Sequence, residues 1–113
     1  MGMYHSTYFA YGIHVVTDQH GWQASEHAET ELPKVKDRCP NVGYLTAGNY
    51  DEDMLFLVTE STEVDLGKFE HVTPARVSAE QQADWDRQLA EAARALGYGE
   101  FSSAGWLVVP DLS

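Results

Sequence analysis

The alternation of hydrophobic and polar residues predicts one well-defined helix, over residues 78–97. Ser78 can cap its start, and Gln81 three residues later completes a Ser-x-x-Gln capping box. Gly97 is suited to the left-handed conformation that ends many helices. Between these ends the apolar residues fall at helical spacing, so the helix should pack one face on the rest of the protein. This apolar stripe consists of Trp85, Leu89, Ala92, Ala93 and Leu96.

Period-two and continuous apolar patterns predict four strands. Residues 6–17 are apolar on both faces, which is typical of a central strand, and Gly12 within them suggests a bulge or a close approach of another element. Residues 42–47 and 54–59 form a predicted hairpin with an acidic loop of six residues, Gly48 to Asp53. The apolar run from Met54 to Val58 predicts a strand buried on both faces. The fourth strand covers residues 106–109 and is ended by Pro110.

The remaining segments give weaker patterns. Residues 25–39 have apolar residues at helical spacing but contain Pro33, so a short broken helix is predicted. Trp22, in the loop before it, is expected to anchor that loop in the core. Residues 61–74 read as a connection pinned by apolar side chains, with a short edge strand as the alternative. Those side chains are Val64, Leu66, Phe69 and Val72.

The order of these elements predicts an α+β fold. It consists of an antiparallel sheet of about four strands, covered on one face by the long helix and by the broken helix at 25–39. The order βαββαβ is that of the ferredoxin-like arrangement. If 25–39 is not helical, the long helix alone covers the sheet. We expect residues 1–113 to form one domain, with flexible ends at 1–5 and 110–113.

Composition narrows the possible partners. The chain has 113 residues, 18 of them acidic and 7 basic, with a formal net charge of -11. Direct binding to nucleic acid or to an anionic membrane is disfavoured, because both require a basic surface. The sequence has no apolar run long enough for a membrane span, and residues 1–5 lack signal-peptide features, so a cytoplasmic protein is expected. The single Cys39 excludes an internal disulfide and is expected to be a small buried residue.

The acidic residues concentrate in the middle of the chain, where Lys68 alone offsets them. One interpretation is that they only keep a small domain soluble. The other is that they present a negative surface to a basic protein partner. The predicted partner-binding residues are Asp51, Glu52, Asp53, Glu60, Glu63, Asp65 and Glu70.

No strong catalytic or metal-binding motif is present, and we expect neither a metal nor another cofactor. Asn49, Asp51, Asp53 and Glu60 have the spacing of calcium ligands in an EF-hand loop. However, Met54 stands where that loop needs glycine, and the flanking residues predict strands instead of helices. The histidines form no cluster with zinc-ligand spacing.

His14 is the one candidate for a general base. In this alternative, a small enzyme or ligand-binding domain uses the uncovered sheet face, with an aromatic wall formed by Tyr8, Tyr11 and Tyr44. A homodimer formed through the same face would bury those aromatic residues without catalysis.

Several short motifs resemble small uncharacterised proteins of actinobacteria and their tailed phages. These motifs are Tyr8-Phe9-Ala10-Tyr11-Gly12, Asn49-Tyr50-Asp51, the Trp85-Asp86 helix ending at Leu96-Gly97, and Gly105-Trp106-Leu107. The resemblance implies a phage or prophage context and brings no catalytic residue with it. Together with the charge distribution, it favours a non-enzymatic accessory protein that binds a basic partner.

Overall fold

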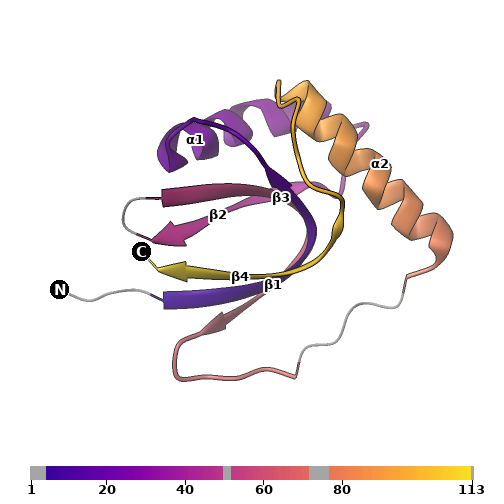
Figure 1. Ribbon diagram of the computed structural model, residues 1–113. Helices are drawn as coiled ribbons and strands as arrows, with labels where there is room; N and C mark the ends of the chain where they lie inside the picture. Colours follow the sequence, from indigo (N-terminus) through magenta and orange to yellow (C-terminus); the bar gives the residue numbers. More distant parts are fainter. Residues whose placement is uncertain (1–4, 50–51, 72–76, 113) are drawn as a thin grey trace.

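Four antiparallel strands form one sheet, and the helices pack on one of its faces (Figure 1). The computed structural model describes residues 5–49, 52–71 and 77–112. The sheet order is β2-β3-β1-β4, so the α+β class and the central positions of the first and third strands are confirmed. The elements are β1 (His5–Val15), α1 (Gly21–Glu31), the 3-10 helix η1 (Leu32–Val35), β2 (Gly43–Asn49), β3 (Glu52–Asp65), α2 (Ala79–Ala95) and β4 (Gly105–Leu112).

Helix α2 confirms the clearest sequence prediction. The Ser78 hydroxyl accepts a hydrogen bond from the Gln81 backbone N–H at 3.0 Å, and Gly97 ends the helix with φ of 92°. The stripe that contains Trp85 and Leu89 is buried against β1 and β3. The helix therefore covers the sheet face that carries Tyr11, Ile13 and Leu57.

The broken helix is also confirmed, although it begins four residues earlier than predicted. The His20 backbone N–H donates to the Gln23 side chain at 3.0 Å, which satisfies one free donor at the start of α1. The chain tightens to η1 at Leu32, with Pro33 in the first turn, where its missing N–H costs little. The anchoring role of Trp22 is wrong, because Trp22 lies on α1 with 66% of its surface exposed. Within the described part of the chain, neither α1 nor α2 nor any other helix is both long and apolar enough to cross a membrane.

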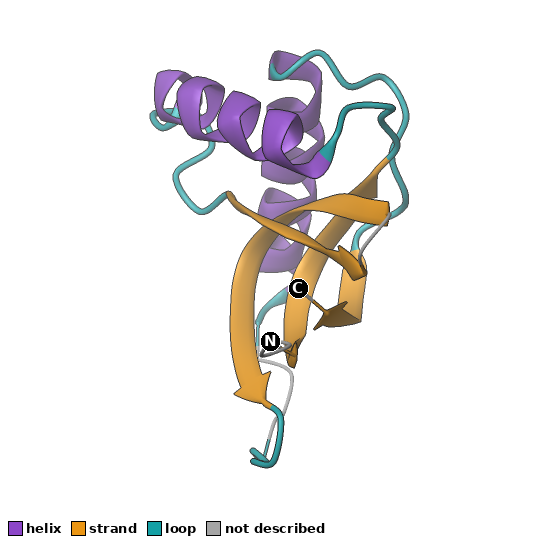
Figure 2. Cartoon of the chain, turned by 90° about the vertical axis from the view of Figure 1, so that its left-hand side faces the viewer, coloured by secondary structure: helices purple, strands orange, loops and turns teal. Residues whose placement is uncertain are grey.

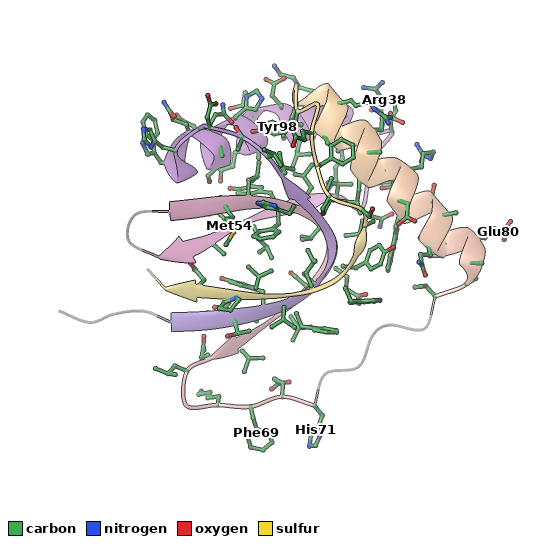
Figure 3. All side chains as sticks on the ribbon, in the orientation of Figure 1. Arg38, Met54, Phe69, His71, Glu80 and Tyr98 are labelled. Atoms are coloured by element: carbon green, nitrogen blue, oxygen red, sulfur yellow. The ribbon has the colours of Figure 1, made fainter. Side chains whose placement is uncertain are left out.

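Strand β3 is much longer than predicted. Its pairing with β2 continues to Asn49 opposite Glu52, so the predicted six-residue loop is too long and residues 50–51, which lie outside the described residues, join the strands. At its other end β3 continues through residues 61–65, paired with β1. Leu66 and Phe69 are 74% and 80% exposed and do not pin a connection. Figure 3 shows the Phe69 side chain pointing away from the sheet. Val72 lies outside the described residues.

Strand β4 also exceeds its predicted bounds. Pro110 does not end it, since it pairs with Thr7 inside the strand. Proline is tolerated there because β4 is an edge strand. In such a strand alternate backbone N–H groups point away from the sheet and make no ladder hydrogen bond, so proline can replace one of these residues without loss. Residues 110–112, expected in a flexible end, are thus part of the sheet.

The sheet curls strongly, so the face away from the helices closes on a second apolar cluster (Figure 2). The two edge strands meet across this curl, where the Gly48 backbone N–H donates to the Asp111 carboxylate at 3.1 Å. The cluster consists of Ala10, Ala47, Phe56, Val58 and Val109, with Tyr8, Leu45 and Leu107 at its margin. Much of the face assigned to catalysis or dimerisation is therefore occupied by the protein itself.

Tyr11 links this sheet to α2. Its hydroxyl donates to the Asp86 carboxylate at 2.6 Å, and its ring contacts Trp85 and Trp106. Burial, followed by the hydrogen bond to Asp86 and the negative charge of Asp86, raises the pKa of Tyr11 to about 12.

This pKa predicts a loss of stability in alkali. The unfolded chain releases the phenol proton near pH 10, whereas the folded chain retains it until about pH 12. Unfolding therefore becomes more favourable as the pH rises from 10 to 12, by roughly 2 kcal/mol from this group. Urea denaturation at several pH values should show a steeper decline for the wild type than for Tyr11→Phe. If the free energy of unfolding fell equally steeply with pH in both proteins, the raised pKa of Tyr11 would be contradicted.

Candidate partner-binding site

The last seven residues of β3, Thr59–Asp65, form a free edge of the sheet. Strand β2 pairs with residues 52–58, whereas β1 pairs with β3 as far as Asp65. Among the described strands, Thr59–Asp65 therefore has a neighbour on one side only. Alternate backbone N–H and C=O groups of such a segment point away from its neighbour. This end of β3 lies on the side of the molecule away from the helices (Figures 1 and 2).

A bulge decides which way the acidic side chains of this segment point. Val58 pairs with Gly12 and Glu60 pairs with Tyr11, so Thr59 is an extra residue in β3. Residues opposite one another share a face. Glu60 therefore lies on the helix-facing side of the sheet. The Thr59 hydroxyl oxygen is buried and has no hydrogen-bond partner among the described residues.

Glu63 and Asp65 lie on the other face, beside a buried serine. Ser6 is 1% exposed, and its hydroxyl oxygen is 2.8 Å from Glu63 Oε2 and 3.4 Å from Asp65 Oδ1. The single hydroxyl proton can be donated to one carboxylate at a time, and the shorter distance favours Glu63. Ser6 thus holds the Glu63 carboxylate next to that of Asp65. We call the segment Thr59–Asp65, with Glu60, Glu63 and Asp65, the acidic edge.

Positive charge lies elsewhere in the molecule. The ion pairs of the described residues all belong to the helices and the turn after η1, and none of them involves the acidic edge or the exposed Glu70. Lys68 is the nearest basic residue in sequence. The carboxylates of the acidic edge therefore have no ion-pair partner among the described residues. The ion pairs are Lys34–Glu31, Arg38–Glu91, Arg87–Asp84 and Arg87–Glu91.

The structure gathers part of the predicted acidic surface. Glu63 and Asp65 share one face of the acidic edge, and Glu60 lies on its other face. Glu70 follows in the exposed connection, between Phe69 and His71 in the sequence; Figure 3 labels these two neighbours. Asp51 lies outside the described residues, as do the side chains of Glu52 and Asp53. The described part of the predicted acidic surface therefore consists of Glu60, Glu63, Asp65 and Glu70.

The tyrosines proposed as an aromatic wall do not assemble around His14. His14 lies on the sheet face away from the helices, which the curl makes concave and which we call the concave face. The centre of its ring is 5.2 Å from that of Phe56. Tyr8 shares this face, but Tyr11 is buried under α2, and the Tyr44 hydroxyl accepts a hydrogen bond from Ser25 of α1 at 3.2 Å. Two of the three rings are thus on the opposite side of the sheet.

The described residues offer no metal centre, since none of their His, Cys, Asp and Glu side chains form a group of three that could hold an ion. Of the residues with EF-hand spacing, Asn49 and Asp53 belong to the β2–β3 hairpin and Glu60 follows the bulge in β3, while Asp51 lies outside the described residues. Cys39 is 2% exposed, and burial raises the pKa of its thiol. Its role is packing, as expected for a small buried residue.

Sequence reasoning missed an open groove of about 760 Å³ at the C-terminal end of α2. Two pairs of its polar groups are bound to one another: the Tyr98 hydroxyl donates to Gln19 Oε1 at 2.7 Å, and His27 Nε2 donates to the Leu96 carbonyl at 2.7 Å. The lining residues come from separate parts of the chain, so no local motif marks the groove.

Comparisons with protein-family models, with curated proteins and with solved structures gave no match to this chain. The acidic edge must therefore be interpreted from its own geometry and charge.

Proposed function

We propose that this protein is a small non-enzymatic interaction protein that binds a basic protein partner through the acidic edge. One observation carries the proposal: Glu60, Glu63 and Asp65 are exposed on one free strand, away from the ion pairs of the helices. Such a concentration of negative charge raises the rate of encounter with a cationic surface. Salt should weaken this attraction between the acidic edge and a cationic surface, because ions screen exposed charges beyond about 8 Å at physiological ionic strength.

Neutralising the acidic edge is expected to weaken binding to a cationic probe roughly tenfold. The variant is Glu60→Gln, Glu63→Gln and Asp65→Asn, and the probe is a decalysine peptide. Three exposed ion pairs at about 0.5 kcal/mol each give a total near the 1.4 kcal/mol of a tenfold change. Titration at low salt, monitored by amide chemical shifts, measures both the affinity and the residues contacted.

A matched control separates the acidic edge from net charge. Glu26→Gln, Glu29→Gln and Asp37→Asn remove the same three charges from exposed positions in α1 and after η1. This control should reduce affinity less than threefold. If both triple variants weaken binding equally, or if the shifts spread over the whole surface, the acidic residues serve solubility and the proposed site is wrong.

For the fold, we propose the ferredoxin-like arrangement. The strand order β2-β3-β1-β4, the helices after β1 and β3, and their common sheet face support it. An arrangement of this kind hosts many unrelated activities, so the binding proposal depends on the acidic edge and not on the fold.

A further inference from the structure

The acidic edge combines unmet backbone hydrogen-bonding capacity with a repeating charge. We propose that the basic partner adds to Thr59–Asp65 as an extended strand with Lys or Arg at alternate positions. This inference rests on the proposed function and specifies how the partner is bound.

The backbone of the segment is already arranged for strand addition. Pairing with β1 from Ser6 to Tyr11 holds residues 60–65 extended, so a partner strand would order little of this chain. Exposed edges are commonly protected by proline, by charged side chains, above all lysine, and by bulges. The segment Thr59–Asp65 contains no proline or lysine, and its bulge lies at Thr59, so residues 60–65 stay in regular register with β1. Its carboxylates protect it against acidic strands but not against basic ones, and its Thr62 and Val64 are β-branched residues that favour strands.

The side chains of the segment alternate between two environments. Ser61, Glu63 and Asp65 lie opposite Ala10, Tyr8 and Ser6 on the concave face. Thr62 and Val64 lie on the other face, opposite Phe9 and Thr7. Residues on one face of a strand recur about every 7 Å. Basic residues two apart in an added strand would therefore meet Glu63 and Asp65, with a β-branched residue between them meeting Val64.

The same charges argue against a second copy of this chain as the occupant. Antiparallel pairing of two acidic edges would place carboxylates near carboxylates, and like charges opposite one another destabilise a sheet. Strand β4 offers a poorer edge for any partner. Pro110 lacks a backbone N–H, and Asp111 is bound to Gly48 of β2. The acidic edge therefore favours a basic extended segment from another protein.

The test uses backbone methylation to separate strand addition from charge attraction. The parent peptide is Lys-Thr-Lys-Thr-Lys-Thr-Lys with blocked ends. One derivative carries N-methyl groups on its three Thr residues, and the other carries them on three Lys residues. In an added strand, the N–H groups of alternate residues all point to the same side. One derivative should therefore lose affinity roughly tenfold or more, and the other should bind within threefold of the parent.

Two further measurements support the comparison. A peptide of the same composition in blocks, Lys-Lys-Lys-Lys-Thr-Thr-Thr, should bind several-fold more weakly than the parent. Binding of the parent should slow hydrogen exchange at alternate amides of residues 59–65. Affinities are measured by fluorescence anisotropy at low salt with the full chain.

The outcomes distinguish this inference from the proposed function. If the two methylated peptides bind equally well or equally poorly, or if decalysine binds and the parent does not, strand addition is overturned. Binding of decalysine that depends on the three carboxylates would still uphold the acidic edge as the binding site. If neither decalysine nor the parent binds, both proposals fail.

Discussion

Replacing Gly12 by alanine is expected to lower the free energy of unfolding by about 3 kcal/mol or more. A Cβ atom at this position would lie against the Leu57 carbonyl oxygen, well inside van der Waals contact, and 2.8 Å from Val58 Cγ1. Rotation of a side chain cannot relieve a clash with the backbone. The central strands β1 and β3 must therefore separate at the bulge. Urea denaturation followed by circular dichroism measures the loss.

Gly105→Ala is the matched control for this prediction. Gly105 in β4 is the direct partner of Gly12 in β1, but an added Cβ there has no atom within 4 Å. The change should alter stability by less than about 0.5 kcal/mol, with a small gain from reduced freedom of the unfolded chain. Similar losses in both variants would mean that glycine flexibility, and not the close approach at Gly12, explains the result.

Local signals explain why the helices could be predicted from the sequence. In α2 the cap, the apolar period and the Gly97 stop lie within one segment and agree with one another. Gly12 likewise marked a close approach, as predicted. What the sequence could not specify was the neighbour of Gly12, because Leu57 and Val58 are distant along the chain.

The acidic edge was recognised by charge but not by structure. Ser61–Asp65 has polar residues on both faces. This part of β3 extends beyond β2 and away from the apolar core, so neither face has to be apolar. Such a segment shows no period-two pattern and reads as a connection. The contact between Ser6 and Glu63 joins residues 57 positions apart, so no local motif could reveal it.

Polarity alone is an incomplete guide to burial in this chain. Gln88 is 1% exposed on α2, where its side chain accepts from the Asn41 backbone N–H at 3.0 Å and donates to the Asn41 side chain at 3.1 Å. A buried amide is acceptable when its hydrogen bonds are made. Conversely, Trp22 and Phe69 are exposed, because a protein surface accommodates single apolar residues.

Leu89→Ala is expected to cost 2 to 5 kcal/mol, roughly the range for removing a fully buried leucine side chain. Leu89 is 0% exposed at the centre of the cluster between α2 and the sheet. The loss combines the forgone burial of the three deleted carbon atoms with the cost of the cavity left in the cluster that contains Trp85 and Leu57. A large loss would show that α2 packs on the sheet through its apolar stripe. Chemical denaturation measures the change in the free energy of unfolding.

Leu66→Ala provides the matched control because it removes the same atoms from a side chain that is 74% exposed. Its effect should remain within about 0.5 kcal/mol, since little apolar surface is lost from the folded state. A loss below 1 kcal/mol for Leu89→Ala would contradict the packing of α2 against the sheet. A comparable loss at Leu66 would mean that the exposed connection after β3 is packed in solution, which would place a contact beside the acidic edge.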